Sequence, residues 1–205
     1  MKFSSSTSLI LGFVVLLGVL VTTAPVDARP RPAEKTTLDK VGSSRATGTM
    51  TAVRSHHTLT LLFSGKVLAV GGSDAEGSAL ASAEIFDPAS GDWTPAGSLL
   101  EARHDHTASL LPSGRVLVAG GRNQAGALAS AEIYDPRTGA WSSVAGAELL
   151  SARWGHTATL LANGEVLVTG GASAGGPLDS AEIYDPDDDQ WRQAGSMSSA
   201  RDQHT

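Results

Sequence analysis

Short runs of Val, Leu, Ile and Thr alternate with turns that contain Gly or Pro over residues 54–200. The run VLAV at residues 67–70 is apolar at every position, so we expect a strand that is covered on both faces. The run SAEIF at residues 82–86 alternates apolar and polar positions, which is typical of a strand with one buried face. The pattern predicts an all-β fold of short strands joined by tight turns.

The order of these runs repeats along the chain. Each copy begins with an Arg-x-x-His-Thr unit, and the copies start at Arg54, Arg103, Arg153 and Arg201, at intervals of 49, 50 and 48 residues. A period of this length marks a chain built from one supersecondary unit, which buries its apolar faces by stacking against copies of itself. The repeat therefore predicts an array of stacked β-units.

Each copy divides into four predicted strands. Ser-Gly or Asn-Gly separates the first strand from the second, since these residues tolerate the positive φ angles of hairpin turns. A glycine pair ends the second strand, where it permits positive φ or a close backbone approach. These glycines are Gly71, Gly72, Gly120, Gly121, Gly170 and Gly171. After an Asp-Pro turn, a large aromatic residue begins the fourth strand and is suited to pinning it against a neighbour. These residues are Trp93, Trp141 and Trp191.

The combination of these signals resembles the kelch pattern, in which a double glycine after an apolar strand and a later Trp recur at about 50 residues. The resemblance covers residues 48–205 and implies a kelch-type β-propeller, an architecture that galactose oxidase shares. It implies blades of four antiparallel strands around a central channel, with the first strand of each blade innermost. We expect blades at residues 54–102, 103–152 and 153–200 and the start of a fourth at 201–205, so the propeller is incomplete.

The N-terminal residues differ in composition from the repeats. Residues 1–28 combine Lys2, an apolar core and a final Val-Asp-Ala, which is typical of a cleaved secretory signal peptide. The apolar core is shorter than the roughly 20 residues that span a bilayer, which disfavours an uncleaved anchor and any membrane span in the mature chain. Residues 29–43 read as a polar linker, and the propeller segment is residues 44–205. We therefore expect a secreted or periplasmic protein.

Charge and composition limit the chemistry of the chain. Its formal net charge of -6 offers no basic surface for a phosphate backbone, so we expect no nucleic-acid partner. The sequence contains no cysteine, which removes disulfides, thiolate metal sites and a thiol nucleophile. Galactose oxidase chemistry, which requires copper and a tyrosine cross-linked to cysteine, is therefore not expected. The sequence predicts no cofactor.

The repeated arginines and histidines recur at one position of each copy. A ring of histidines around a propeller axis is a poor metal site, since the ligands would lie far apart and metal sites usually combine unlike residues at irregular spacing. We expect these side chains to satisfy buried backbone groups where one blade meets the next. The residues of this frame are Arg54, His57, Arg103, His106, Arg153 and His156.

The acidic turn at residues 185–189 resembles the beginning of a calcium loop. Its carboxylates stand at alternate positions, but Gln190 and Ser196 replace the glycine and the glutamate that the motif requires. We interpret the segment as a solvated turn, and the sequence predicts no metal site.

The positions that differ between copies carry the candidate binding residues. A four-strand meander brings its second connection and the inter-blade link to the same end of the blade. Varied polar and aromatic residues on a repeated frame are typical of a recognition surface, although ordinary solvated loops are the alternative. The candidates are His56, His104, Asp105, Arg122, Asn123 and Trp154.

These observations lead to three hypotheses about function. The first is an exported, non-catalytic module that binds a protein or a carbohydrate, and the lack of a catalytic motif outside the repeats favours it. The second is the propeller portion of a galactose oxidase-like or other carbohydrate-active enzyme, whose active site lies outside this chain. The third is a truncated gene product without independent function. Open flanks of the first and last blades also favour self-association.

Overall fold

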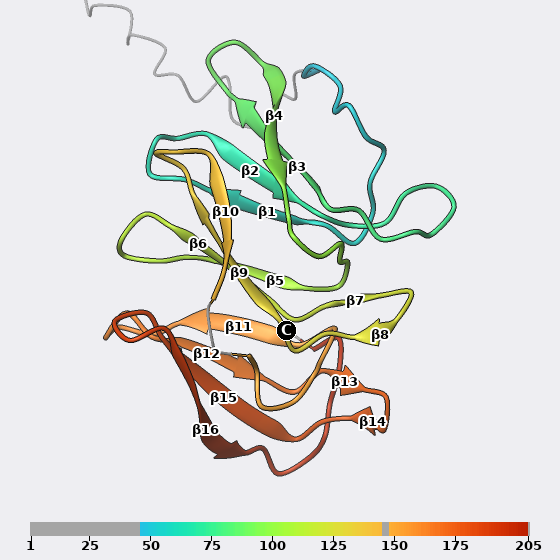
Figure 1. Cartoon of the computed structure of the whole chain (residues 1–205), viewed down its shortest axis with the longest axis vertical. Coiled ribbons are helices and arrows are strands. Elements are labelled where there is room, and N and C mark those ends of the chain that lie inside the picture. Colours follow the sequence, from blue (N-terminus) through green and yellow to red (C-terminus); the bar gives the residue numbers. More distant parts are fainter. Residues whose placement is uncertain (1–45, 145–147, 205) are drawn as a thin grey trace, which may run out of the picture. The chain divides into compact units, whose positions relative to one another are not determined.

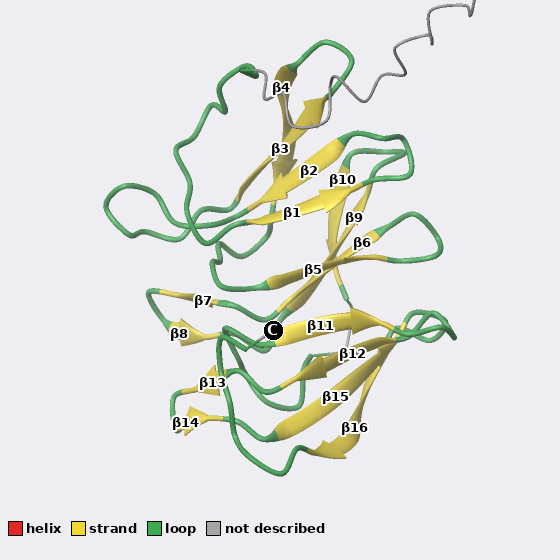
Figure 2. Ribbon diagram, turned by 180° about the vertical axis from the view of Figure 1, so that it is seen from behind, coloured by secondary structure: helices red, strands yellow, loops and turns green. Residues whose placement is uncertain are grey.

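The computed structural model describes residues 46–144 and 148–204, and these consist of strands, turns and loops. No helix occurs in these two ranges, as Figure 2 shows. The strands form three four-stranded antiparallel sheets, one for each complete repeat, and two short hairpins. The predicted all-β fold and its four-stranded blades are therefore confirmed. The predicted signal peptide and linker lie outside the described residues.

The first blade is a simple meander in which each strand pairs with the next. Its strands are β1 (Thr58–Leu61), β2 (Val67–Val70), β3 (Ser82–Asp87) and β4 (Asp92–Ser98). The Ser-Gly turn between β1 and β2 places Gly65 at a φ of 80°. This left-handed conformation is the reason for a glycine at that position.

The second and third blades repeat this plan. The second blade contains β5 (Thr107–Leu110), β6 (Val116–Ala119), β9 (Ala131–Asp135) and β10 (Ala140–Ser143). The third blade contains β11 (Thr157–Leu160), β12 (Val166–Thr169), β15 (Ser180–Asp185) and β16 (Gln190–Ser196). The additional hairpins are β7 (Arg122–Asn123) with β8 (Gly126–Ala127), and β13 (Ala172–Ser173) with β14 (Gly176–Pro177). The sequence predicts only variable connections where these hairpins form.

The first strands of the three blades are neighbours, because β5 contacts both β1 and β11. Figure 1 shows β5 lying between these two strands. The fourth strands lie at the opposite edges of the sheets. This is the order expected when the first strand of each blade is innermost.

Apolar side chains fill both junctions between blades. At the first junction, Leu68 and Val70 of β2 pack with Val116 and Val118 of β6, and all four are fully buried. Strands β6 and β12 meet in the same way at the second junction. Burial of each such side chain contributes about 1.5–3 kcal/mol. The second strand of the middle blade, β6, is apolar at all four positions because its two faces pack against different blades.

The glycine pair at the end of each second strand accommodates two close approaches. A Cβ atom on Gly120 would lie 2.7 Å from the carbonyl oxygen of Arg153, and one on Gly121 would lie 2.8 Å from that of His104. The first glycine therefore faces the next link and the second faces the link of its own blade. The corresponding glycines Gly71, Gly72, Gly170 and Gly171 have approaches of 2.5 to 2.7 Å.

The tryptophans tie each fourth strand to its surroundings. The ring centre of Trp141 lies 4.9 Å from that of Tyr134 on the adjacent strand. Its Nε1 atom donates a hydrogen bond of 2.9 Å to the carbonyl oxygen of Ala96, in β4 of the preceding blade. The other cross-strand aromatic pairs are Phe86 with Trp93 and Tyr184 with Trp191.

The segment that leads into β1 follows the edge of the first blade. The amide of Gly48 donates a hydrogen bond of 2.8 Å to the carbonyl oxygen of Gly91. The amide of Thr51 donates to Glu84 Oε2, also at 2.8 Å. In the next repeat, Leu100 makes the equivalent contact with Glu132. Gly48 therefore lies where the outer strand of a preceding blade would end.

Candidate binding site at the loop end of the blades

The inter-blade links and the second connections meet at one end of the blades, which is termed the loop face. His104 in a link and Arg122 in β7 exchange backbone hydrogen bonds of 3.0 and 2.9 Å. Trp154 and Ala172 are paired in the same way in the third blade. The structure thus brings three of the sequence candidates, His104, Arg122 and Trp154, to the same end of neighbouring blades.

A chain of contacts joins the candidate side chains across the second blade and the next link. Asp105 Oδ2 lies 2.9 Å from His104 Nδ1 and accepts a hydrogen bond of the same length from Arg122 Nε. The guanidinium carbon of Arg122 lies 3.9 Å from the centre of the Trp154 ring, which is a cation–π arrangement. The Arg122 side chain is 39% exposed, whereas that of Asp105 is 13% exposed. Contacts within the cluster therefore hold its side chains in place, and part of the Arg122 side chain remains exposed to solvent.

The remaining two candidates lie at the margin of this cluster. The ring centre of His56 is 6.2 Å from that of His104, and His56 is exposed. Asn123 Nδ2 donates to the carbonyl oxygen of Ala102 at 3.3 Å, and Asn123 Oδ1 accepts from the amide of Ala125 at 2.8 Å. Asn123 thus holds its own hairpin against the link, and His56 extends the surface onto the first blade.

One residue in each link has a left-handed backbone conformation and binds its counterpart in the next link. These residues are His56, Asp105, Gly155 and Gln203, with φ angles of 54°, 54°, 60° and 49°. The amide of each donates to the carbonyl oxygen of the previous one, at 3.1, 2.9 and 2.7 Å along the chain. We term this arrangement the backbone row. It fixes the main chain at the loop face without using the side chains.

Buried ion pairs hold the links beneath this surface. Arg103 Nη2 donates to Glu132 Oε1 at 2.8 Å, and Nη1 donates to the carbonyl oxygen of Gly120 at the same distance. Glu132 also accepts hydrogen bonds from two backbone amides of the link. The equivalent pairs are Arg54 with Glu84 and Arg153 with Glu182. Each link is thus fastened to the third main strand of the blade that it enters.

The glutamates of these pairs are not evident from the sequence pattern. Each stands at a polar position of an alternating strand, which predicts a solvated side chain, yet each is almost fully buried. Burial opposes ionisation of Glu84, but hydrogen bonds from the Thr51 amide and from Arg54 outweigh it and lower the pKa of the carboxyl group. The sequence does contain one signal of these pairs, because a glutamate follows each of the first three repeated arginines by 29 or 30 residues.

The repeated histidines join the inner strands of adjacent blades. His106 Nε2 lies 2.9 Å from Thr58 Oγ1, and His156 Nε2 lies 2.9 Å from Thr107 Oγ1. The sequence predicts backbone partners for these rings, whereas the structure provides threonine hydroxyls. Burial, assisted by repulsion from the nearby arginine, lowers the pKa of both imidazoles to about 3. Both rings are therefore neutral near neutral pH and serve as hydrogen-bond partners at the junctions.

Two leucines on the inter-blade links have exposed side chains. Leu100 and Leu150 occupy the same position of successive links, and they are 67% and 61% exposed. Their backbone amides bind Glu132 and Glu182, so the main chain is fixed while the side chains point away from the core. Neither leucine is among the sequence candidates, and the leucine that precedes each one is buried.

The described part of the chain contains no evident metal centre. Within residues 46–144 and 148–204, no three side chains of His, Asp or Glu are arranged to hold a metal ion. In the acidic turn, Asp185 and Asp188 accept hydrogen bonds from the amides of Asp187 and Gln190, so these carboxylates stabilise the turn itself. Nor do these residues form any helix with the length and apolar character that crossing a bilayer requires.

Comparison with protein families agrees with the repeat geometry. Residues 56–205 match the model of the KLHDC2/KLHL20/DRC7 Kelch-repeats domain. The chain belongs to the kelch-repeat family. A kelch domain indicates a protein-interaction module. A comparison with curated proteins gave no match.

Proposed function

We propose that the chain is an exported, non-catalytic kelch module that binds a protein partner through its loop face. The proposal rests on the preorganised cluster of Asp105, Arg122 and Trp154 above the backbone row. These positions differ between repeats, while the frame beneath them is constant. Export rests on the signal-like sequence of residues 1–28.

A protein partner suits this surface better than a glycan. A sugar ring would stack on an open aromatic face, but Arg122 already covers one face of Trp154. Arginine and tryptophan are among the residues that contribute most to protein interfaces. Leu100 and Leu150 add exposed apolar side chains on the links, which a protein surface can bury.

The chemistry of the loop face supports binding rather than catalysis. The Asp105 carboxylate already binds His104 and Arg122. The buried glutamates that pair with the frame arginines also accept hydrogen bonds from backbone amides. The buried histidines have pKa values of about 3, far below the range in which a general base operates near neutral pH. These groups maintain the surface and are not poised for proton transfer.

Site-specific photo-cross-linking tests the binding proposal. A photoreactive amino acid replaces Leu100 at the loop face or, as a control, the exposed Ser90 in the β3–β4 turn. We expect a cross-linked protein from position 100 and none from position 90. The cross-link should disappear in Trp154→Ala and weaken in Leu150→Ser. Cross-linking from position 90 alone, or a product that persists in both variants, would contradict the proposal.

The export part of the proposal has an independent test. Intact-mass measurement of protein recovered from the medium or periplasm is expected to show loss of about residues 1–28. Recovery only from the cytoplasm with Met1 retained would exclude export, while leaving the binding proposal unaffected.

A further inference from the structure

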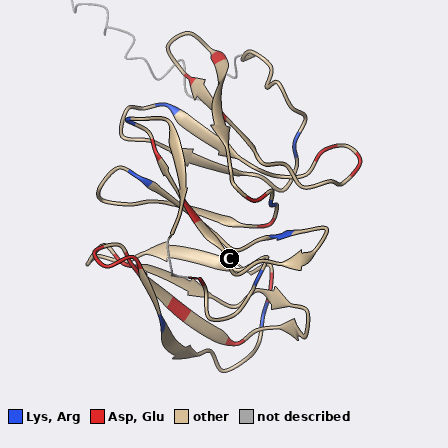
Figure 3. Cartoon of the chain, in the orientation of Figure 1, with Lys and Arg blue, Asp and Glu red and all other residues tan. Residues whose placement is uncertain are grey.

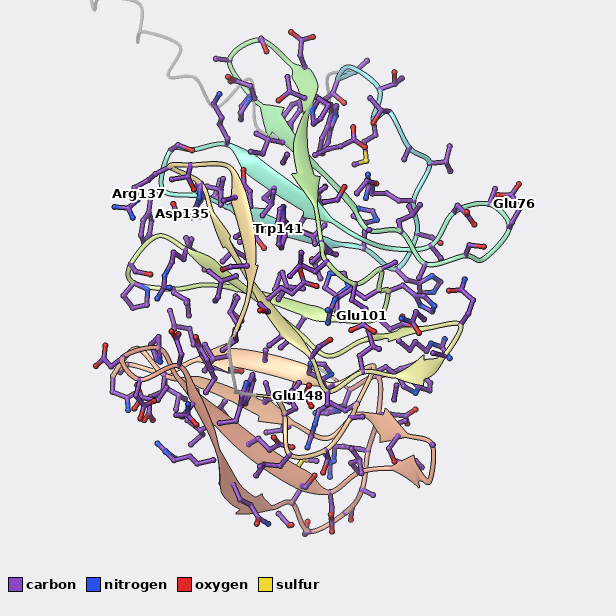
Figure 4. The ribbon with its side chains drawn as sticks, in the orientation of Figure 1. Glu76, Glu101, Asp135, Arg137, Trp141 and Glu148 are labelled. Atoms are coloured by element: carbon purple, nitrogen blue, oxygen red, sulfur yellow. The ribbon has the colours of Figure 1, made fainter. Side chains whose placement is uncertain are left out.

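The opposite end of the blades, termed the turn face, contains an apolar pocket of about 290 Å³ at the junction of the first and second blades. Leu62, Phe63, Gly114, Asp135, Pro136 and Arg137 line it. The β1–β2, β5–β6 and β9–β10 turns supply these residues. Figure 4 shows Asp135 and Arg137 together at this end, whereas Glu76 in the second connection of the first blade lies at the other.

Phe63 gives the pocket its apolar wall and has no evident role in the fold. Its side chain is 74% exposed and lies over Gly114, where an added Cβ atom would be 3.5 Å from the ring. The corresponding residues of the next two repeats are Pro112 and Ala162, so the blade does not require an aromatic residue there. The neighbouring Leu62, by contrast, is 4% exposed and belongs to the core.

The equivalent pocket at the second junction is smaller and has a different charge. Its volume is about 170 Å³, with Pro112 in place of Phe63 and Asp187 in place of Arg137, while Arg115 also lines it. Figure 3 shows acidic residues gathered in the β15–β16 turn and basic residues in the turns of the first two blades. Of the two junctions that the structure describes, only the first combines an aromatic wall with a cation at the rim.

Arg137 supplies that cation. Its side chain is 82% exposed, and its Nη2 atom lies 3.2 Å from Asp135 Oδ2. Asp135 Oδ1 also accepts a hydrogen bond of 2.8 Å from the backbone amide of Arg137, so this carboxylate stabilises the turn. A guanidinium has five N–H donors in a planar fork, and Asp135 occupies only part of them. The remaining donors face solvent beside the pocket.

We propose that this pocket binds a segment of a partner protein in which a large apolar side chain is followed by Asp or Glu. The apolar side chain would pack between Phe63 and Pro136, and the carboxylate would pair with Arg137. A concave apolar wall with one polar group is the usual composition of a small binding site. The ion pair contributes selectivity more than affinity, because exposed ion pairs are weak. The site is separate from the loop face and does not depend on the function proposed for it.

Blocked dipeptides test this site on the full chain by ligand-observed saturation-transfer NMR. The compounds are acetyl-Phe-Glu-amide, acetyl-Phe-Gln-amide, which lacks only the charge, and acetyl-Ala-Glu-amide, which lacks the aromatic ring. We expect saturable binding of the Phe-Glu compound and about two- to fivefold weaker binding of the Phe-Gln compound. The Ala-Glu compound should give no signal.

Variants then locate the binding. Phe63→Ser should abolish it, and Arg137→Gln should make the Phe-Glu and Phe-Gln compounds bind equally. Pro112→Ser, at the equivalent position of the second junction, is the matched control and should change neither. Because Phe63 and Arg137 are exposed, both variants should fold, which circular dichroism verifies. The proposal is overturned if the Phe-Glu compound does not bind saturably, binds no better than the Phe-Gln compound, or binds Phe63→Ser as it binds the parent chain.

Discussion

Arg103 Nη2 donates a hydrogen bond to Glu132 Oε1 at 2.8 Å, and both side chains are almost completely buried. The arginine lies in the link between the first two blades, and the glutamate lies in β9 of the second blade. Removal of one partner from a buried ion pair leaves an uncompensated charge in the interior. This pair therefore makes the path of the link depend on the folding of the blade that follows it.

Replacement of Glu132 by Ala is expected to lower the free energy of unfolding by about 3–5 kcal/mol, because Arg103 and two backbone amides lose their acceptor. Glu101→Ala is the control, since Glu101 lies 3.7 Å from Arg103 but is 41% exposed. Its expected cost is below about 1 kcal/mol. Urea unfolding measures both values. Equal losses would contradict the importance of the buried pair.

Gly121→Ala should be far more destabilising than Gly126→Ala. Both glycines have positive φ angles, so both substitutions strain the backbone, but only a Cβ atom on Gly121 meets neighbouring atoms closer than 3 Å. Nothing lies within 4 Å of the position on Gly126. We expect a loss of about 1–2 kcal/mol at Gly126 and more than about 3 kcal/mol at Gly121. Melting temperatures that fall by the same amount would contradict the steric explanation.

Stability should fall with acid before the carboxylates titrate. The pKa values of His106 and His156 are about 3 in the folded chain, below the ordinary 6.5, so the unfolded state binds more protons between these values. The contribution of these two histidines to stability is therefore fully present above pH 6.5 and is lost as pH falls toward 3. The free energy of unfolding then decreases with a slope that approaches about 1.4 kcal/mol per pH unit for each ring. Urea unfolding at pH 6 and 5 measures this slope, and His106→Gln should reduce it. A stability that does not change over this interval would refute the prediction.

The first blade should mediate self-association of the chain that lacks residues 1–28. Leu59 and Leu61 are 59% and 64% exposed, whereas Ala108 and Leu110 at the same positions of the second blade pack against the first-junction core. Large exposed apolar areas drive association. We expect sedimentation velocity to show concentration-dependent association that Leu59→Ser with Leu61→Ser reduces. Leu100→Ser with Leu150→Ser is the control, because it removes similar exposed area from the links. If the chain stays monomeric at all concentrations, the exposed leucines of the first blade do not drive association and the prediction is wrong.

The blade plan was predictable because its signals are local. The Ser-Gly turn, the apolar second strand and the glycine pair each lie next to the strand boundary that they define. Their recurrence at fixed intervals then indicates that blades stack, as the packing of Leu68 against Val116 shows. The short β7–β8 hairpin was not predictable, since Arg122-Asn123 has no strand-like pattern and is too short to show one.

The contacts that order the loop face were only partly predictable. The common end of the links and second connections follows from the meander, and the pairing of His104 with Arg122 agrees with it. The partners of the frame residues lie far away in sequence: Glu132 is 29 residues from Arg103, and Thr107 is 49 residues from His156. Alternation within one strand cannot distinguish a solvated glutamate from a buried, ion-paired one.

The backbone row makes the chain a suitable scaffold for directed evolution. Because main-chain atoms alone connect His56, Asp105, Gly155 and Gln203, a change of side chain at these positions leaves the backbone hydrogen bonds of the row in place. Position 105 is the exception for the surface above the row, since its carboxylate binds His104 and Arg122. The left-handed conformation limits which amino acids can be used at these positions, since Gly, Asn, Asp and His adopt it readily and β-branched residues do not. A library limited to the permitted residues would therefore vary the chemistry of one face while every member retains the same frame.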